Sequence, residues 1–319
     1  MNDTQPDKQL CTQHDATDLD IQTIASYYPV GSIKSAQPVG NGNSSSAKRL
    51  SCNTGSYILR QLRDLTQAQI ESDIATALTS LSLSPPFIAT RSGQWYIEWD
   101  GNYYNLQPDW WDGSEQSLSL PHWTEIGYKL AVFHSISRHA HWSVQTDRFE
   151  LAQQWQSLYI SIEHARQSCS AHWSSGSVLE QLEQHIPACV CVQQQYDGYV
   201  HGDLGMWNIL LTEHSTYMID YGEVRPGHSH FDIAALVASA LTVSDANIAR
   251  QQWTAFCTGY ELKLPIQPEQ LSAQLRLWIV RGAVALLLQQ GISERTIRYA
   301  EQMLERIPRL TTILCPAHS

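Results

Sequence analysis

The residues best suited to catalysis lie in one segment, residues 199–223, which reads YVHGDLGMWNILLTEHSTYMIDYGE. Two carboxylates and one carboxamide, Asp203, Asp220 and Asn208, stand between short apolar runs of this segment. Carboxylate and amide oxygens suit a hard cation such as Mg²⁺, which takes its remaining ligands from water and from nucleotide phosphates. The segment therefore predicts a metal site with a further carboxylate beside it.

The apolar runs Ile209–Leu211 and Tyr217–Ile219 are separated by a polar stretch, a pattern typical of a β-hairpin. Antiparallel pairing about this turn predicts that Asn208 and Asp220 lie opposite each other, with α-carbons roughly 5 Å apart. We expect Asp203, five residues before Asn208, in the preceding loop, where it faces the same site.

The spacing from Asp203 to Asn208 matches the catalytic loop of kinases, and Asp220-Tyr221-Gly222 resembles their metal-binding element. A glycine before the loop aspartate resembles the aminoglycoside phosphotransferase and choline kinase superfamily. Two flanking segments are similar to this family as well: Gly127–Ser137 resembles the helix before the catalytic loop, and Phe231–Leu236 resembles a later helix start. The likeness spans roughly residues 30–300 and is closest to the homoserine-kinase-like and N-acetylhexosamine-kinase-like branches.

This resemblance implies a role for each residue of the set. Asp203 would position or deprotonate the acceptor hydroxyl, and Asn208 and Asp220 would hold magnesium. His201 would brace the loop through hydrogen bonds, and Asp232 would be a buried acid that accepts backbone N–H groups of the loop. Chance alone seldom produces such an ordered set, although any one of these aspartates could equally be a turn or helix cap.

A Gly/Asn/Ser loop between two predicted strands, GNGNSSS, is the expected contact for nucleotide phosphates. Gly40 and Gly42 let backbone amides approach a phosphate closely, and Ser44 lies in the same loop. The kinase pattern GxGxxG is incomplete here because Ser45 replaces its last glycine.

Arg60 stands in the predicted strand SYILRQL, where a kinase has its phosphate-pairing lysine. A guanidinium can pair bidentately with phosphate oxygens, so Arg60 is the expected replacement. Its expected partner on the following helix is Glu71, because its side chain is longer than that of the alternative, Asp73.

The remaining site residues are expected by position. Gln107 and Asp109 resemble the hinge between kinase lobes, whose backbone groups contact adenine. Three residues of the chemical segment are possible contacts of the acceptor, namely Trp207, Tyr221 and Glu223.

The elements before the chemical segment predict an antiparallel sheet with one helix. Strand-like runs fill the stretch from Ile33 to Leu62, and a helix follows whose first turn, Thr66–Gln69, has the spacing of a capping box. Asp100-Gly101-Asn102 is a tight-turn signal between two further strands. Beyond Gly113 we expect long amphipathic helices at about 121–138, 147–168, 177–196, 245–261, 267–290 and 292–307.

These elements predict a small antiparallel lobe and a larger helical lobe, and the resemblance implies that they form an α+β, bilobal, protein-kinase-like fold. The expected boundaries are a tail at 1–17, an N-lobe at 18–106, a hinge at 107–113 and a helical C-lobe at 114–319.

The composition agrees with an enzyme that acts on small molecules. The chain has 319 residues, of which 43% are hydrophobic and 16% charged, and it has no run of 18 apolar residues. A net charge of −11 makes nucleic acid and anionic membranes unexpected partners. The seven cysteines form no CxxC pair, so we expect reduced thiols. The first twenty residues lack the basic and apolar regions of a signal peptide, so we expect a cytoplasmic location.

The sequence thus favours an ATP- and Mg²⁺-dependent transfer of the γ-phosphate to a hydroxyl of a small molecule. An amino alcohol, sugar, amino sugar or aminoglycoside would fit the superfamily. The alternatives are a non-catalytic kinase-fold module that binds nucleotide, and a protein serine/threonine kinase of the stress-response type. The acceptor, the choice between ATP and GTP, and the oligomeric state stay open.

Overall fold

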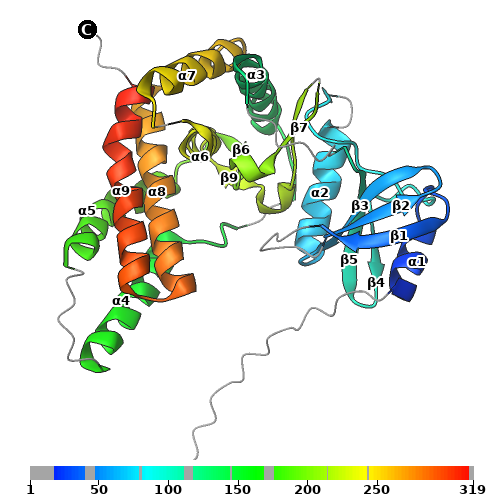
Figure 1. Cartoon of the computed structure of the whole chain (residues 1–319), viewed down its shortest axis with the longest axis horizontal. Helices are drawn as coiled ribbons and strands as arrows, with labels where there is room; N and C mark the ends of the chain where they lie inside the picture. The colour runs from blue at the N-terminus through cyan, green and yellow to red at the C-terminus, as the bar shows by residue number, and fades with distance from the viewer. Residues whose placement is uncertain are drawn as a thin grey trace, which may run out of the picture. The chain divides into compact units, whose positions relative to one another are not determined.

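The computed structural model describes residues 18–39, 47–78, 81–110, 118–143, 146–168, 176–213, 215–242 and 244–315. Two compact units make up the chain (Figure 1): the first is Met1–Ala68 with Pro86–Asp109, and the second is Gln69–Pro85 with Trp110–Ser319. This division differs from the expected N-lobe, 18–106, because it places Gln69–Pro85 in the second unit.

The first unit contains an antiparallel sheet, five-stranded in the described part of the chain, with the order β1-β2-β3-β5-β4. As predicted, a two-residue turn joins its last two strands: Asp100 and Gly101 have φ of 49° and 70°, the left-handed values of a type I′ hairpin turn. The strands are β1 Ile33–Pro38, β2 Ala47–Cys52, β3 Gly55–Leu62, β4 Tyr96–Trp99 and β5 Asn102–Pro108.

Helix α1, Asp18–Ser26, supplies one side of the core of this unit. Ile21 and Ile24 are fully buried with Leu50 of β2 and Leu106 of β5 in one apolar cluster. Burial of such aliphatic side chains contributes about 1.5–3 kcal/mol each, so this cluster fixes the sheet on which Arg60 stands.

Helix α2, Leu65–Leu78, begins earlier than predicted. The carboxylate of Asp64 accepts a hydrogen bond from the backbone N–H of Gln67 at 2.8 Å, so Asp64 caps the helix in place of the expected Thr66. Aspartate is a better N-cap residue than threonine, and this preference explains the earlier start. Ile70 and Ile74 lie on the buried face, as predicted.

The second unit is mainly helical. Helix α8 packs against α4, α5, α6 and α9, and α8 and α9 run side by side in Figure 1. Its helices are α3 Leu120–Ser137, α4 Leu151–Ser168, α5 Gly176–Gln193, α6 His230–Ala240, α7 Ala246–Tyr260, α8 Pro268–Gln290 and α9 Glu294–Leu314.

Two of these helices are strongly apolar. Among the described residues, α8 alone is long and apolar enough to cross a membrane by length and composition, and half of its apolar window is buried inside the structure. Helix α6 was not among the amphipathic segments predicted, because residues 230–238 are all buried and no exposed face creates a helical period.

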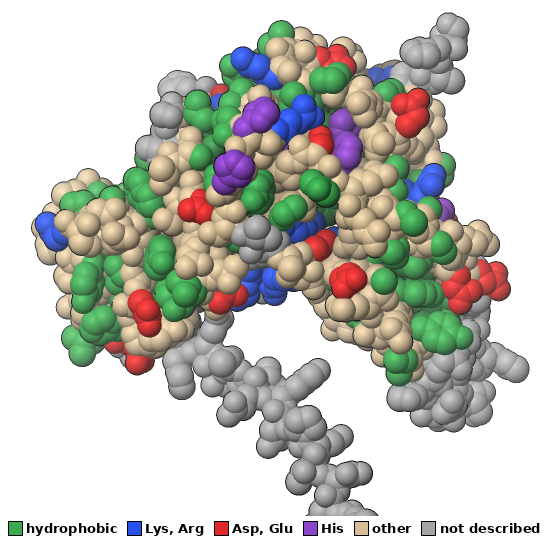
Figure 2. All heavy atoms as spheres, turned by 180° about the vertical axis from the view of Figure 1, so that it is seen from behind, with side chains coloured by type: hydrophobic (Ala, Val, Ile, Leu, Met, Phe, Trp, Pro, Cys, Tyr) green, Lys and Arg blue, Asp and Glu red, His purple; other side chains and the backbone are tan. Residues whose placement is uncertain are grey.

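On the face shown in Figure 2, acidic and basic side chains are scattered among apolar ones rather than gathered by sign.

Helices α3 and α7 cross at a point where both have glycine. A β-carbon added at Gly127 of α3 would lie 2.2 Å from the carbonyl oxygen of Phe256. One added at Gly259 of α7 would lie 1.9 Å from the carbonyl oxygen of Thr124. The backbones are therefore in direct contact, and this contact fixes α3, which bears several side chains of the site described below.

We predict that Gly127→Ala destabilises the protein by about 1–3 kcal/mol, because the new methyl group meets backbone that cannot yield. The matched control is Gly282→Ala in α8, where a β-carbon meets only the flexible end of Met303. Alanine favours a helix over glycine by about 0.8–1.0 kcal/mol, so the control stays neutral or gains stability. Urea unfolding measures both; equal stability of the two variants would contradict the close crossing.

Candidate functional site

The segment expected to do chemistry is held at both ends by a short antiparallel pair. Strand β6, Gly198–Val200, pairs with β9, Arg225–Gly227, so that Val200 lies opposite Arg225. The segment between these two strands therefore begins and ends at neighbouring positions, Val200 and Arg225. Pairing of this kind fixes where a loop starts and ends, while the side chains inside decide its conformation.

Inside the segment, the 3₁₀ turn Met206–Asn208 leads into the hairpin of β7, Ile209–Leu211, and β8, Thr216–Met218. The predicted pairing of Asn208 with Asp220 is wrong by one residue. Ile209 pairs with Met218, and the N–H of Ile219 donates to the carbonyl of Asn208 at 3.0 Å.

The physical reason for this shift is the length of the turn. Four residues, 212–215, connect the strands in place of the five expected, because Thr212 and Ser215 close the turn between themselves. The N–H of Thr212 donates to the carbonyl of Ser215 at 2.9 Å, and the N–H of Ser215 donates to Oγ1 of Thr212 at 3.1 Å. Such local side-chain bonds set hairpin register.

Helix α3 anchors the hairpin through two charged residues that sequence analysis missed. Lys129 Nζ donates to Oγ of Ser215 at 2.8 Å, and Glu125 accepts the N–H of Thr216 at 3.0 Å. The two side chains also form a salt bridge at 3.0 Å. Their spacing of four residues on one helix face was the available signal.

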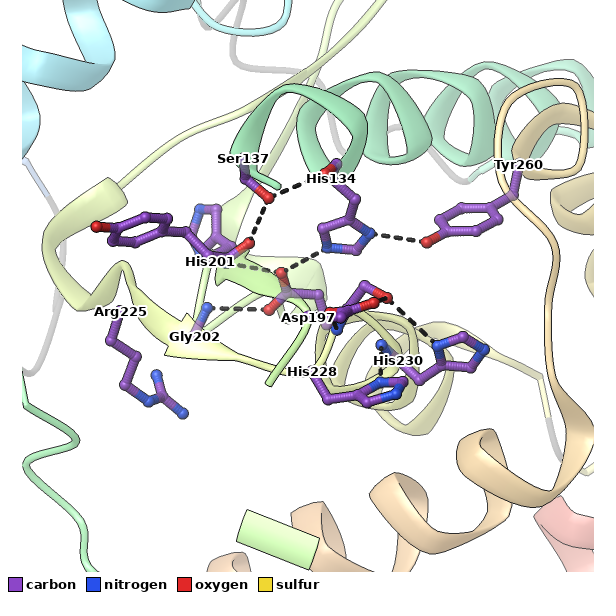
Figure 3. A network of polar contacts seen from close by, with 12 residues as sticks. His134, Ser137, Asp197, His201, Gly202, Arg225, His228, His230 and Tyr260 are labelled. Carbon is purple, nitrogen blue, oxygen red and sulfur yellow. Dashed lines mark hydrogen bonds and ion pairs between the residues drawn. The ribbon is translucent and has the colours of Figure 1, made fainter. Parts of the chain in front are cut away.

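The carboxylate of Asp232, on α6, is fully buried and accepts hydrogen bonds from His134, His201 and Gly202, three residues labelled in Figure 3. Its Oδ2 accepts the N–H of His201 at 2.6 Å, and its Oδ1 accepts the N–H of Gly202 at 2.9 Å. Burial alone would raise the pKa of Asp232, but the hydrogen bonds from His134 and Gly202 hold its pKa below the ordinary value. The carboxylate is therefore ionised and holds the loop backbone.

His134, on α3, completes this buried network and was not singled out from the sequence. Its Nε2 donates to Asp232 at 3.0 Å, and its Nδ1 forms a hydrogen bond with the hydroxyl of Tyr260 at 2.9 Å. Both residues are fully buried, so helices α3 and α7 each contribute one member to the support of the loop. The close crossing of the two helices at Gly127 makes this arrangement possible.

His201 links the two halves of the chemical segment. Its ring Nε2 donates to the carbonyl of Ile219 at 3.0 Å, directly before Asp220. Its ring also lies 4.9 Å from that of Tyr221, which is fully buried. This burial contradicts the expectation that Tyr221 contacts the acceptor, since its side chain packs beneath the loop. His201 of the loop is therefore connected directly to Ile219 at the end of the hairpin.

Gly202 explains the glycine of the HGD sequence. Its φ is +84°, and an added β-carbon would lie 2.0 Å from Arg225 Nη1 and 2.2 Å from the carbonyl oxygen of Glu223. Both the left-handed backbone and the lack of space exclude any other residue. The loop thus runs between the Asp232 carboxylate and the Arg225 guanidinium.

Asp203 and Asn208 are joined directly. The side-chain nitrogen of Asn208 donates to the carbonyl of Asp203 at 2.7 Å and to its Oδ2 at 3.2 Å. Among the described residues, the hydrogen bonds of the Asn208 side chain are made by its nitrogen and not by its amide oxygen. That oxygen is the group left for a cation, which fits the role expected of this residue.

Asp220 directly follows Ile219, whose N–H donates to the carbonyl of Asn208, and its charge acts on Asp203. Burial raises the pKa of Asp203 above its ordinary value, and the charges of Asp220 and Glu223 raise it further, while His201 and the indole N–H of Trp207 oppose this rise. Asp220 has φ of +63°, a left-handed conformation that turns the chain sharply at the end of the hairpin.

The donor set fits magnesium better than zinc. Among the residues that the structure describes, no group of three His, Cys, Asp or Glu side chains gathers to hold a metal. Asn208 and Asp220 offer oxygen donors only, and Mg²⁺ is commonly bound by one or two such protein ligands plus phosphate and water. These two residues could therefore hold a magnesium–nucleotide complex.

The residues expected to contact the nucleotide are distributed over both units. Arg60 is buried in β3 opposite Asn105 of β5, and Gln107 pairs with Ile58. Asp109 is bound within the first unit: its carboxylate pairs with Arg49, and its N–H donates to the carbonyl of Ser56. Gly40, Gly42 and Ser44 lie outside the described residues, and the nucleotide contacts stay predictions.

Glu71 and Asp73, the two possible partners of Arg60, have different surroundings in the second unit. Asp73 accepts the N–H of Ser143 at 2.8 Å and its hydroxyl at 2.9 Å. Glu71 is buried, and its charge adds to the burial that raises the pKa of Tyr221. Glu71 therefore lies near the residue that follows Asp220, whereas Asp73 ties α2 to the segment after α3.

A buried charge group supports the far side of the loop and was not foreseen. Asp147 pairs with Arg281 and with Arg225, whose Nε lies 3.3 Å from the carboxylate. Arg225 in turn donates to the carbonyl of Glu223 at 3.2 Å, and the Glu223 side chain pairs with Arg148 at 2.6 Å. The carboxylate of Glu223 therefore stays partly exposed, and its charge acts on Asp203.

The chain is similar to known proteins in sequence and in fold. The sequence profile of the phosphotransferase enzyme family matches residues 35–264. A comparison with curated protein sequences finds no match.

Solved structures share the fold at low sequence identity. One is spectinomycin phosphotransferase with ADP and spectinomycin, at 16% identity over 92% of this chain and 98% of that chain, with a TM-score of 0.64. Another is amicoumacin kinase in complex with AMP-PNP, Ca²⁺ and Ami, at 13% identity over 94% of this chain and 96% of that chain, with a TM-score of 0.68. A third is a microcompartment-associated aminopropanol kinase, at 16% identity over 92% of this chain and 98% of that chain, with a TM-score of 0.63. The kinase-like fold predicted from the sequence is confirmed.

The charge group of Asp147 predicts a pH-dependent stability. Burial would raise the pKa of Asp147, but Arg225 and Arg281 lower it to about 2, below its value in the unfolded chain. A depressed folded-state pKa stabilises the protein above the unfolded value, and this gain is lost as the pH falls toward 2. We expect this pH-dependent part to be about 2 kcal/mol at pH 7.

Urea unfolding of Asp147→Asn between pH 7 and pH 3 measures this effect. Relative to wild type, the variant is least stable near pH 7, and the difference shrinks toward pH 3. The control is Glu294→Gln, which removes a carboxylate that is 89% exposed and pairs only at the surface. A difference that stays constant with pH in Asp147→Asn would show that its charge does not hold the loop support.

Proposed function

Because the chain belongs to the phosphotransferase enzyme family, we propose that it transfers the γ-phosphate of ATP to a hydroxyl group of a small molecule, with Mg²⁺. One observation supports this most: a buried carboxylate, Asp232, fixes the loop that places Asp203 beside Asn208 and near Asp220. A base, an amide oxygen and a second carboxylate at one place are the parts that phosphoryl transfer needs.

In this proposal Asp203 orients the acceptor hydroxyl and accepts its proton as the oxygen attacks the γ-phosphate. Its raised pKa brings the carboxylate closer to the range where a general base is effective at neutral pH. Asn208 and Asp220 would hold magnesium, which supplies neutralisation of the phosphate charges. His201 and Asp232 keep these side chains in place and do not touch the substrate.

The acceptor we propose is an alcohol or sugar that bears an amine. The negative charges of Asp220 and Glu223 both act on Asp203, and such a set of carboxylates favours a cation. The ring of Trp207 is 59% exposed beside Asp203, so a substrate can reach it. The solved aminopropanol kinase, whose named substrate is an amino alcohol, supports this choice by its likeness in fold.

A second candidate is a kinase-fold protein that binds nucleotide without transferring phosphate. It is motivated by Arg60, which stands where a kinase has lysine. Retention of Asp203, Asn208 and Asp220 together favours catalysis. A protein kinase with the same loop would label protein in a lysate rather than a small molecule.

For the enzyme we also propose a cytoplasmic location, where ATP is supplied.

Phosphate transfer from ATP with Mg²⁺, measured over a panel of amino alcohols, sugars, amino sugars and aminoglycosides, tests the function. We expect turnover with an amine-bearing acceptor. Asp203→Asn should lower kcat by about 10²–10⁴-fold, because it removes the general base, while the Kd for MgATP stays close to that of wild type. Asp220→Ala should instead abolish magnesium-dependent binding of ATP, as calorimetry would show.

Two results would count against these roles. Wild-type turnover in Asp203→Asn would remove this residue from the mechanism, and unchanged MgATP affinity in Asp220→Ala would remove the metal site. Binding of MgATP by wild type without turnover on any acceptor, together with no labelled protein, would favour the non-catalytic candidate.

A further inference from the structure

Trp207 is a large apolar side chain in an unusual place. It lies in the 3₁₀ turn Met206–Asn208, and 59% of its surface is exposed. A tryptophan this exposed buries little apolar area, so packing gives a weak reason for its presence. Its contacts within the loop are therefore informative.

The first contact joins Trp207 to the proposed base. The indole Nε1 donates to Oδ2 of Asp203 at 3.3 Å, and the side-chain nitrogen of Asn208 donates to the same oxygen at 3.2 Å. Among the described residues, no hydrogen bond reaches Oδ1 of Asp203. Two donors on one oxygen restrict rotation of the carboxylate and leave the other oxygen available.

The second contact holds the indole itself. A β-carbon added at Gly205 would lie 2.2–2.4 Å from three atoms of the Trp207 ring, Cζ2, Cε2 and Cη2. Gly205 has φ of −90°, a value that any residue adopts, so the backbone conformation does not require glycine here. The requirement is space: the ring lies directly against the α-carbon of Gly205.

We propose that Gly205 and Trp207 form a clamp that fixes the Asp203 carboxylate, so that Oδ1 is the oxygen that meets the acceptor hydroxyl. Gly205 provides the surface on which the indole lies, and the indole N–H holds Oδ2. Trp207 is thus a positioning residue for the transfer reaction. This inference rests on the proposed function for its catalytic meaning, whereas the contact itself can be tested without any acceptor.

A loosely held base misplaces the proton acceptor during the chemical step and leaves nucleotide binding unaffected. Loss of the clamp should therefore lower kcat, while the KM for MgATP keeps its value. If Trp207 were only structural, its substitution would change both kcat and the KM for MgATP by loosening the loop, or would change neither value.

The contact is tested by NMR of protein labelled with ¹⁵N-tryptophan, which contains eleven indole N–H groups. Trp207→Phe identifies the signal of Trp207 by its disappearance. We expect Asp203→Asn and Gly205→Ala each to move this signal, because one changes the acceptor and the other displaces the ring. Gly282→Ala, whose new methyl meets only Met303, is the control and leaves the signal in place.

An unmoved Trp207 signal in Asp203→Asn would overturn the proposal, whether or not the protein turns over any acceptor. This result is independent of the panel of acceptors, so failure of the clamp and failure of the proposed function are distinguishable.

The catalytic consequence is tested with the acceptor found in the panel. Trp207→Phe keeps an aromatic ring and loses the N–H, so kcat should fall roughly three- to tenfold with the KM for MgATP unchanged. Trp155→Phe is the matched control, since Trp155 lies on α4 against Tyr159. Wild-type kcat in Trp207→Phe, or an equal fall in MgATP affinity, would contradict a positioning role.

Discussion

A single ionised carboxylate inside the protein, that of Asp232, determines the arrangement of the site. It is fully buried and accepts N–H groups from His201, Gly202 and His134. A buried charge is costly unless its hydrogen bonds are satisfied, so these donors cannot move away without a large loss of stability. The backbone directly before Asp203 is therefore fixed by its hydrogen bonds to Asp232. His201 transmits this constraint to the residue before Asp220 through the carbonyl of Ile219.

The surroundings of the loop follow from the same constraint. Gly202 lies between Asp232 on one side and Arg225 on the other, and only glycine fits this space. Arg225 is held by Asp147, and His134 is held by Tyr260 across the crossing of α3 and α7. Supports that act from separate helices position the base more rigidly than contacts within a flexible loop would.

The sequence predicts the parts of this structure that depend on local pattern. Strand-like runs and long amphipathic segments predict the two lobes of the kinase-like fold. The spacing from Asp203 to Asn208 predicts the candidate site. The one-residue shift of the hairpin escaped prediction, because bonds between Thr212 and Ser215 set the length of the turn. Contacts between distant residues escaped it too: Asp147 and Arg281 are 134 positions apart, and no local pattern joins them.

In the proposed reaction, Asn208 and Asp220 hold a metal bound to nucleotide beside Asp203. A crystal structure with Mn²⁺ and a non-hydrolysable ATP analogue tests this most directly, since manganese gives an anomalous signal that locates the ion. We expect the ion to be bound by the amide oxygen of Asn208 and the carboxylate of Asp220, together with the nucleotide. An ion bound by other residues, or nucleotide bound with no ion at Asn208 and Asp220, would contradict this role of the two residues.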